Sequence, residues 1–246
     1  MKYDSINKLF QFEDLSLKHA ITTRHSFTEN DFNLSFHTGN RESVIANRDR
    51  LQAYFVGNKF LTIPKQCHQA HIFKVTESCA SSIPEDTDAL ITNTRGHVLG
   101  VLSADCVPVL LHDPVNQVLG LAHAGWKGTV ASIAPLTALK MVQEYGSVIT
   151  DIKVYIGPSI SQANFEVGEE VVSHFNNMDL HDVILTEQGK SKIDLWKANA
   201  ILIMRLGVLD TNIKQANVCT VDGVNHFYSA RKEGFGTGRF GFFAML

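Results

Sequence analysis

The chain has 246 residues, of which 44% are hydrophobic and 19% charged, and its formal net charge is -3 at pH 7. This composition is typical of a globular protein that is large enough to bury a core without disulfide or metal staples. The lysines and arginines are scattered, which excludes the basic stripe that nucleic-acid binding requires. No stretch is as apolar and long as a membrane span or a signal peptide, so we expect a cytoplasmic protein.

No linker, low-complexity tract or internal repeat interrupts the sequence, and we therefore predict a single domain over residues 1–246. In chain order, apolar periodicity and β-branched runs predict a helix at 44–54, strands at 89–92, 98–102, 107–112 and 118–122, a helix at 130–145, a strand at 152–156, a helix at 168–176, a strand at 183–186, a helix at 195–206 and a strand at 217–220. The helix at 195–206 has Asp194 in the N-cap position and Gly207 just past its end.

Residues 112–117, with the sequence HDPVNQ, fit a four-residue loop between two antiparallel strands. If His112 pairs with Gln117, the register places Cys106 directly opposite His123. Opposed side chains have Cβ atoms roughly 4.5 to 5.5 Å apart, so a thiolate and an imidazole could share a metal ion or a proton. The alternative for Cys106 is a small buried hydrophobe, which is a common role for a free cysteine.

A further metal ligand can come from the short polar stretch at 66–71, which contains His68 and His71. Catalytic zinc takes nitrogen and sulfur ligands, uses three protein groups and keeps one position open. One of the two histidines would complete such a set with Cys106 and His123. The signatures of nucleobase deaminases and of zincin proteases are absent, and no H-x-H pair suggests multicopper chemistry.

Several sequence blocks run in order along nearly the whole chain and are specific. They are NLSFH at 33–37, QCH at 66–68, DAL at 88–90, ADCVPV at 104–109, AHAGWKG at 122–128, IGPSI at 156–160, FEVG at 165–168, DLW at 194–196 and TGRF at 237–240. The chain in this respect resembles the bacterial laccase-domain family, long called polyphenol oxidase or multicopper polyphenol oxidoreductase, whose members are purine nucleoside phosphorylases with adenosine deaminase activity. The resemblance implies an α+β fold of mixed sheets layered with helices, similar to the cysteine-hydrolase fold of deamidase toxins.

The resemblance also implies one mononuclear Zn²⁺ site with His68, Cys106 and His123 as ligands and catalytic groups, with copper as the less favoured metal. It selects His68 over His71 because His68 completes the Q-x-H pattern of the family. The implied substrates are adenosine, inosine or S-methyl-5'-thioadenosine, together with phosphate. Two positions depart from the family pattern, because this chain has Ser159 where cysteine is frequent and Gln69 where glycine is frequent.

The two reactions place different demands on such a site. Deamination needs a water that zinc activates for attack on purine C6, whereas phosphorolysis needs a site for the phosphate anion. We expect that anion at the helix start at 128–129 or at the glycine-rich loop 234–238. Asp105 could orient a ligand or exchange protons, and His37 could line the pocket. The basic side chains that could bind the anion are Lys127, Arg231 and Arg239.

Three other functions remain open on the sequence. In a metal-free hydrolase or deamidase, Cys106 would be the nucleophile and His123 the base. A copper-dependent phenol oxidase would need added copper for its activity. A non-enzymatic scaffold would hold zinc for structure alone, with a fourth protein ligand such as His71. A homo-oligomer is compatible with the sequence.

Overall fold

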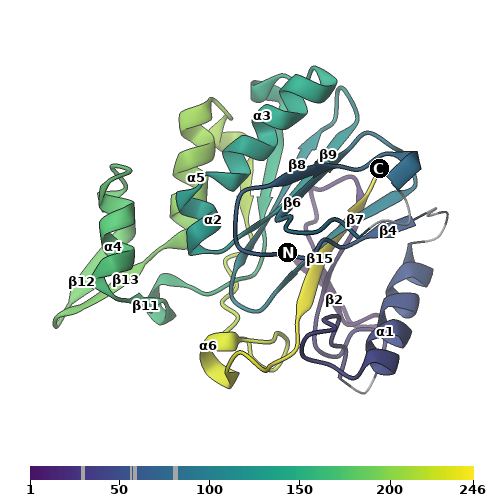
Figure 1. Cartoon of the computed structure of the whole chain (residues 1–246), viewed down its shortest axis with the longest axis horizontal. Helices are drawn as coiled ribbons and strands as arrows, with labels where there is room; N and C mark the ends of the chain where they lie inside the picture. Colours follow the sequence, from purple (N-terminus) through teal and green to yellow (C-terminus); the bar gives the residue numbers. More distant parts are fainter. Residues whose placement is uncertain (29–30, 56, 58–59, 80–82) are drawn as a thin grey trace.

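Two six-stranded sheets pack face to face, and helices cover their outer faces (Figure 1). The structure is a computed structural model that describes residues 1–28, 31–55, 57, 60–79 and 83–246. Between the sheets, Val101 and Phe242 of the first sheet share one buried apolar cluster with Leu110 and Leu121 of the second. Mixed sheets layered with helices confirm the predicted α+β class.

The first sheet is built around the C-terminal strand, which pairs antiparallel with both of its neighbours. In spatial order its strands are β1 (Lys2–Asp4), β2 (Leu9–Gln11), β3 (Lys18–Thr22), β15 (Phe240–Met245), β7 (His97–Ser103) and β4 (Phe60–Thr62). Its outer face is covered by helix α1 (Arg41–Tyr54), where Leu51 and Phe55 pack with Val98 and Phe243.

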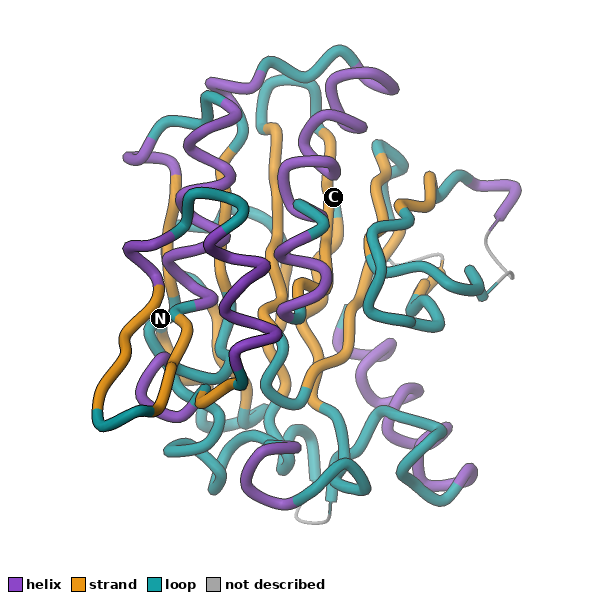
Figure 2. The backbone as a smooth tube through the Cα atoms, turned by 60° about the vertical axis from the view of Figure 1, so that its left-hand side comes forward, coloured by secondary structure: helices purple, strands orange, loops and turns teal. Residues whose placement is uncertain are grey.

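The second sheet carries the hairpin predicted from the sequence. In spatial order its strands are β14 (Ile213–Gln215), β10 (Lys153–Ile156), β8 (Val107–Asp113), β9 (Val118–Ala124), β6 (Ala89–Thr92) and β5 (Ile72–Lys74). Helices α3 (Ile133–Tyr145) and α5 (Leu195–Leu206) cover its outer face and share its apolar core. Figure 2 shows these helices in front of the strands.

A small third sheet projects to the side of the two large ones (Figure 1). Its strands are β11 (Glu166–Val167), β13 (Lys190–Ile193) and β12 (Ile184–Glu187). Helix α4 (Glu169–Asn176) packs beside this sheet, and the short helix α6 (Ala230–Glu233) precedes the last strand. No helix in the described part of the chain is long and apolar enough to cross a membrane.

Several predicted elements are confirmed with small shifts at their ends. The helix at 195–206 begins and ends as expected, because the Asp194 side chain accepts a hydrogen bond from the Lys197 N–H and Gly207 closes the helix at φ 110°. The predicted helix at 130–145 is instead two helices, α2 (Trp126–Val130) and α3, since Ser132 between them has a left-handed φ of 59°. The predicted strand at 217–220 is wrong, because that segment forms only one isolated bridge, from Cys219 to Ser159.

The hairpin has the predicted loop length, but its register is shifted. Asp113 pairs with Val118, so that His123 lies opposite Pro108. The predicted pairs of His112 with Gln117 and of Cys106 with His123 are therefore wrong. The shift has a local cause: the Asp113 carboxylate accepts hydrogen bonds from the N–H groups of residues 115 and 116, and so it becomes the first residue of the turn.

The buried imidazole of His112 predicts a pH dependence of folding. It is 2% exposed on β8, and its Nε2 has no hydrogen-bond partner among the described residues. Burial lowers the pKa of His112 to about 4. Between pH 6.5 and 4, the imidazole is therefore protonated in the unfolded chain and neutral in the folded chain. Stability should therefore fall as the pH drops through this window.

When the pH is lowered from 7.5 to 5.0, the free energy of unfolding should fall in both proteins. We expect the fall in His112→Leu to be smaller than in the wild type by about 2 kcal/mol. Urea denaturation at the two pH values measures this difference. His25→Leu, which replaces an exposed imidazole, is the matched control and should keep the wild-type pH dependence. Equal losses in His112→Leu and the wild type would contradict the assignment.

Candidate functional site

A three-residue link carries the chain from the first sheet to the second, and it places Cys106 where the two sheets meet. The link, residues 104–106, connects β7 to β8. Asp105 adopts a left-handed φ of 95°, and its carboxylate accepts hydrogen bonds from the Thr220 hydroxyl at 2.6 Å and the Arg231 N–H at 2.7 Å. The Ser103 hydroxyl donates to the Cys106 carbonyl at 2.6 Å. Asp105 therefore holds the link in place, and it is not one of the three residues whose side chains could together hold a metal ion.

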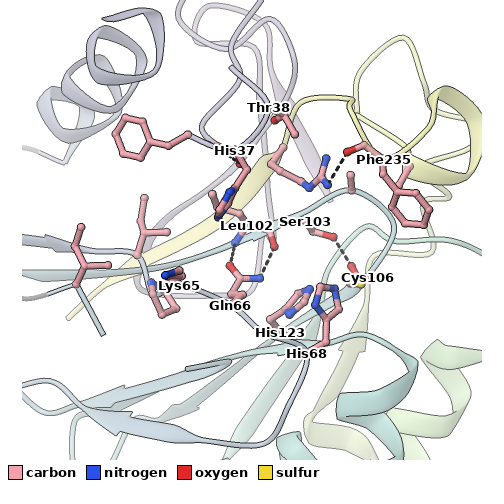
Figure 3. A pocket seen from close by; sticks show the side chains of 18 of the residues that line it. His37, Thr38, Lys65, Gln66, His68, Leu102, Ser103, Cys106, His123 and Phe235 are labelled. Atoms are coloured by element: carbon pink, nitrogen blue, oxygen red, sulfur yellow. Dashed lines mark hydrogen bonds between the residues drawn. The ribbon is translucent and has the colours of Figure 1, made fainter. Parts of the chain in front are cut away.

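Three potential metal ligands from distant parts of the chain converge beside this link. One ligand atom each of His68, Cys106 and His123 lies within 4.8 Å of the others. Figure 3 shows His68 and His123 side by side, with Cys106 next to them. There is no room for a side chain at Gly125, where a Cβ would lie 2.9 Å from the Cys106 sulfur. The glycine of the HAGW block thus lets the backbone approach the cluster closely.

A fully buried carboxylate, Asp88, is hydrogen-bonded to two of the three potential ligands, His68 and His123. It accepts hydrogen bonds from Nδ1 of His123 at 2.9 Å and from the N–H groups of Cys67, His68 and Gln69 at 2.8 to 3.1 Å. These bonds hold His68 at a left-handed φ of 63°. Sequence reasoning noted Asp88 only as part of a motif; the signal that could have shown its role is an acid directly before an apolar strand.

The stretch that carries His68 is also tied to the first sheet. The Gln66 side chain donates to the Leu102 carbonyl and accepts from the Leu102 N–H, both at 2.8 Å, as a neighbouring strand would. This pairing explains why glutamine precedes the ligand in the Q-x-H pattern. The segment that carries His68 is therefore tied to the first sheet through Gln66 and, through Asp88, to the start of a strand of the second sheet.

The charges of the cluster are strongly coupled. Burial lowers the pKa of His123, but Cys106 and Asp88 outweigh it and raise that pKa to about 9. Burial raises the pKa of Cys106, but His123 and His68 bring it down to about 6. Burial also opposes ionisation of Asp88, yet hydrogen bonds from His123 and Gln69 hold its pKa well below the usual range. A cation placed among these groups would meet a thiolate and a carboxylate-backed imidazole.

This donor set fits a zinc-like ion. Asp88 fixes the proton of His123 on Nδ1, which leaves Nε2 as the ligand atom, and such carboxylate support is typical of metal-binding histidines. Two imidazoles and one thiolate match a catalytic zinc site with an open position. His71 lies outside the group, and its Nδ1 is hydrogen-bonded to the Thr87 hydroxyl at 2.9 Å.

Two pockets flank the cluster. The larger has a volume of about 770 Å³, the smaller about 660 Å³, and both are lined by His68, Cys106 and Phe235. His123 lines the larger pocket, whose walls include apolar residues such as Leu102. A substrate that reacts at the cluster can thus place one part on each side of it.

The basic residues predicted to bind an anion are divided between the two pockets. Lys127 and Arg231 line the smaller pocket, whereas Arg239 and His37 line the larger. The guanidinium of Arg231 donates to the carbonyls of Asn164 and Glu166, both at 3.0 Å. The predicted helix start at 128–129 is wrong, because α2 begins at Trp126 and both residues are buried inside it.

Of the two departures from the expected motifs, only Ser159 uses its side chain in a described contact near this part of the fold. Ser159 is fully buried, and its hydroxyl accepts a hydrogen bond from the Trp196 indole N–H. The Gln69 N–H is one of the donors to Asp88, a contact that depends on the backbone and not on the side chain. Neither side chain belongs to the three-ligand group.

Comparison with known proteins adds an independent observation. Residues 18–246 match the family described as multi-copper polyphenol oxidoreductase laccase. The chain is 34% identical to a purine nucleoside phosphorylase of Bacteroides thetaiotaomicron, with 94% of each protein covered. It is 35% identical to adenosine deaminase RL5 from an unknown prokaryotic organism, with 73% of this chain and 72% of that protein covered. The crystal structure of the hypothetical protein YfiH of Bacillus licheniformis superposes with a TM-score of 0.92 at 27% identity, covering 98% and 97% of the two chains.

The role of Asp88 leads to a prediction for metal affinity. In Asp88→Asn, the amide cannot accept as a carboxylate does from His123 and the backbone of residues 67–69, so both histidines lose their orientation. We expect Zn²⁺ to bind about 10- to 100-fold more weakly, as measured by competition with a chromogenic chelator. Asp49→Asn, on the exposed side of α1, is the control. Wild-type affinity in Asp88→Asn would show that Asp88 does not support the site.

Proposed function

The chain belongs to the multi-copper polyphenol oxidoreductase laccase family, and we propose that it is an enzyme, a zinc-dependent purine nucleoside phosphorylase with adenosine deaminase activity. The names of its relatives support this proposal. The observation that carries it is the convergence of His68, Cys106 and His123 at the junction of two pockets. The proposed substrates are adenosine, inosine or S-methyl-5'-thioadenosine, with phosphate.

The ligand set supports one ion and favours zinc over copper. In the described part of the chain, the three-residue cluster is the only group of histidine, cysteine and acidic side chains close enough to hold a metal. Multicopper oxidation would need several such groups. When bound, zinc would supply a Lewis acid at the junction of the pockets, held by His68, Cys106 and His123.

Different residues around the cluster can bind the two substrates of phosphorolysis, the nucleoside and the phosphate. In this reaction an oxygen of phosphate bonds to the anomeric carbon of the ribose while the bond to the purine breaks. The larger pocket offers apolar walls for the base, and Lys127 at the smaller pocket offers a positive charge for the anion. Lys127 is exposed, and its ammonium lies 5.6 Å from the centre of the Trp126 ring. The guanidinium groups of Arg231 and Arg239 already donate to backbone carbonyls, so Lys127 is the more available cation.

A metal-free cysteine hydrolase is the second candidate, and one observation favours it. The pKa of Cys106 is lowered to about 6 beside two imidazoles, as in an activated nucleophile. Alkylation separates the two candidates. If zinc occupies the site, iodoacetamide should modify Cys106 only after a chelator removes the metal, because the bound thiolate is engaged. Equal modification with and without zinc would favour the hydrolase.

The direct test incubates zinc-loaded protein with adenosine, with and without phosphate, and separates adenine, inosine and hypoxanthine by chromatography. We expect adenine only when phosphate is present, inosine in both cases, and no product from Cys106→Ala. Cys79→Ala, which changes a cysteine in the turn at 77–79, is the control and should keep the activity. If the zinc-loaded wild type converts no purine, the proposed function is wrong.

A further inference from the structure

One large aromatic side chain at the junction of the two pockets is almost completely exposed. Phe235 is 87% exposed and lines both the larger and the smaller pocket. Figure 3 shows its ring at the edge of the larger pocket, on the side of Cys106. A single exposed apolar residue is common on protein surfaces. Its position beside the metal-ligand candidates is what requires an explanation.

The loop that carries Phe235 is held firmly by its own polar contacts. The guanidinium of Arg239 donates to three carbonyls of the loop, including those of Phe235 at 3.2 Å and Gly238 at 2.9 Å. The Thr237 hydroxyl donates to Glu233 at 2.9 Å, and Glu233 forms an ion pair with Arg24 at 3.0 Å. The predicted anion ligand Arg239 thus acts here as an anchor of the loop.

The same loop is packed tightly at one end and open around the aromatic ring. A Cβ on Gly238 would lie 2.6 Å from the Tyr228 ring, whose hydroxyl donates to Asp31 at 2.6 Å. In contrast, a Cβ on Gly234 or Gly236, on either side of Phe235, would meet no atom within 4 Å. The backbone is therefore fixed, while the ring projects into open space.

We propose, on the basis of the proposed function, that the Phe235 ring stacks on the purine of the bound nucleoside and sets its affinity. A rigid aromatic ring loses little entropy on binding, and its face pairs favourably with a second ring. Stacking reads the flat face of the base and makes no hydrogen bond to its edge. The contact accordingly suits adenine and hypoxanthine equally and adds ground-state binding without taking part in bond breaking.

A fluorescent reporter tests the contact without any turnover. Zinc-loaded Phe235→Trp is titrated with inosine in the absence of phosphate, and the emission of the wild type, which contains Trp126 and Trp196, is subtracted. We expect saturable quenching, because the purine would stack on the new indole. Val115→Trp carries a control reporter on the β8–β9 turn, where Val115 is 69% exposed, and should not be quenched. Absence of quenching in Phe235→Trp would overturn the proposal.

Steady-state kinetics provide the second arm. Phe235→Ala should raise the KM for inosine about tenfold with kcat changed less than twofold, because uniform binding is lost. Phe235→Tyr should restore the wild-type KM, and Phe235→Leu should not. An unchanged KM in Phe235→Ala with active enzyme would overturn stacking but leave the phosphorylase intact. If inosine quenches Phe235→Trp but the zinc-loaded wild type converts no nucleoside, the stacking contact is kept and the proposed function is overturned.

Discussion

One buried carboxylate determines the geometry of the whole site. Asp88 precedes β6 in the second sheet, and it accepts hydrogen bonds both from the ring of His123 on β9 and from the backbone that presents His68. Burying a charged carboxylate costs free energy unless hydrogen-bond donors contact its oxygens. Here five donors satisfy it, two from side chains and three from the backbone. The desolvation cost of Asp88 is thus offset by bonds that also orient the two histidines.

The position of the site follows from the way the chain passes between the sheets. β7 belongs to the first sheet and β8 to the second, and only residues 104–106 separate them. A crossing this short brings the edges of two layers together, and its left-handed residue, Asp105, is tied to Thr220 and to the start of α6. The pockets therefore form where the layers meet, and residues from several distant segments line them.

Local signals in the sequence predict much of this structure, and non-local contacts account for the rest. The helix at 195–206 was predictable because Asp194 and Gly207 act on adjacent backbone. The hairpin register was not, since two candidate turns of equal length differ only in whether Asp113 caps the turn. The sequence itself suggested Cys106 and His123, and the family resemblance selected His68, whereas the support from Asp88 depends on contacts between residues far apart in sequence.

The backbone at His68 has a consequence for how the protein can change. A side chain other than glycine at φ 63° costs roughly 1 to 3 kcal/mol, and the hydrogen bonds to Asp88 compensate for this strain. Glycine at this position would remove both the ligand and the strain. Loss of the proposed metal ligand by that route would thus relieve backbone strain, so selection for stability alone works against this histidine.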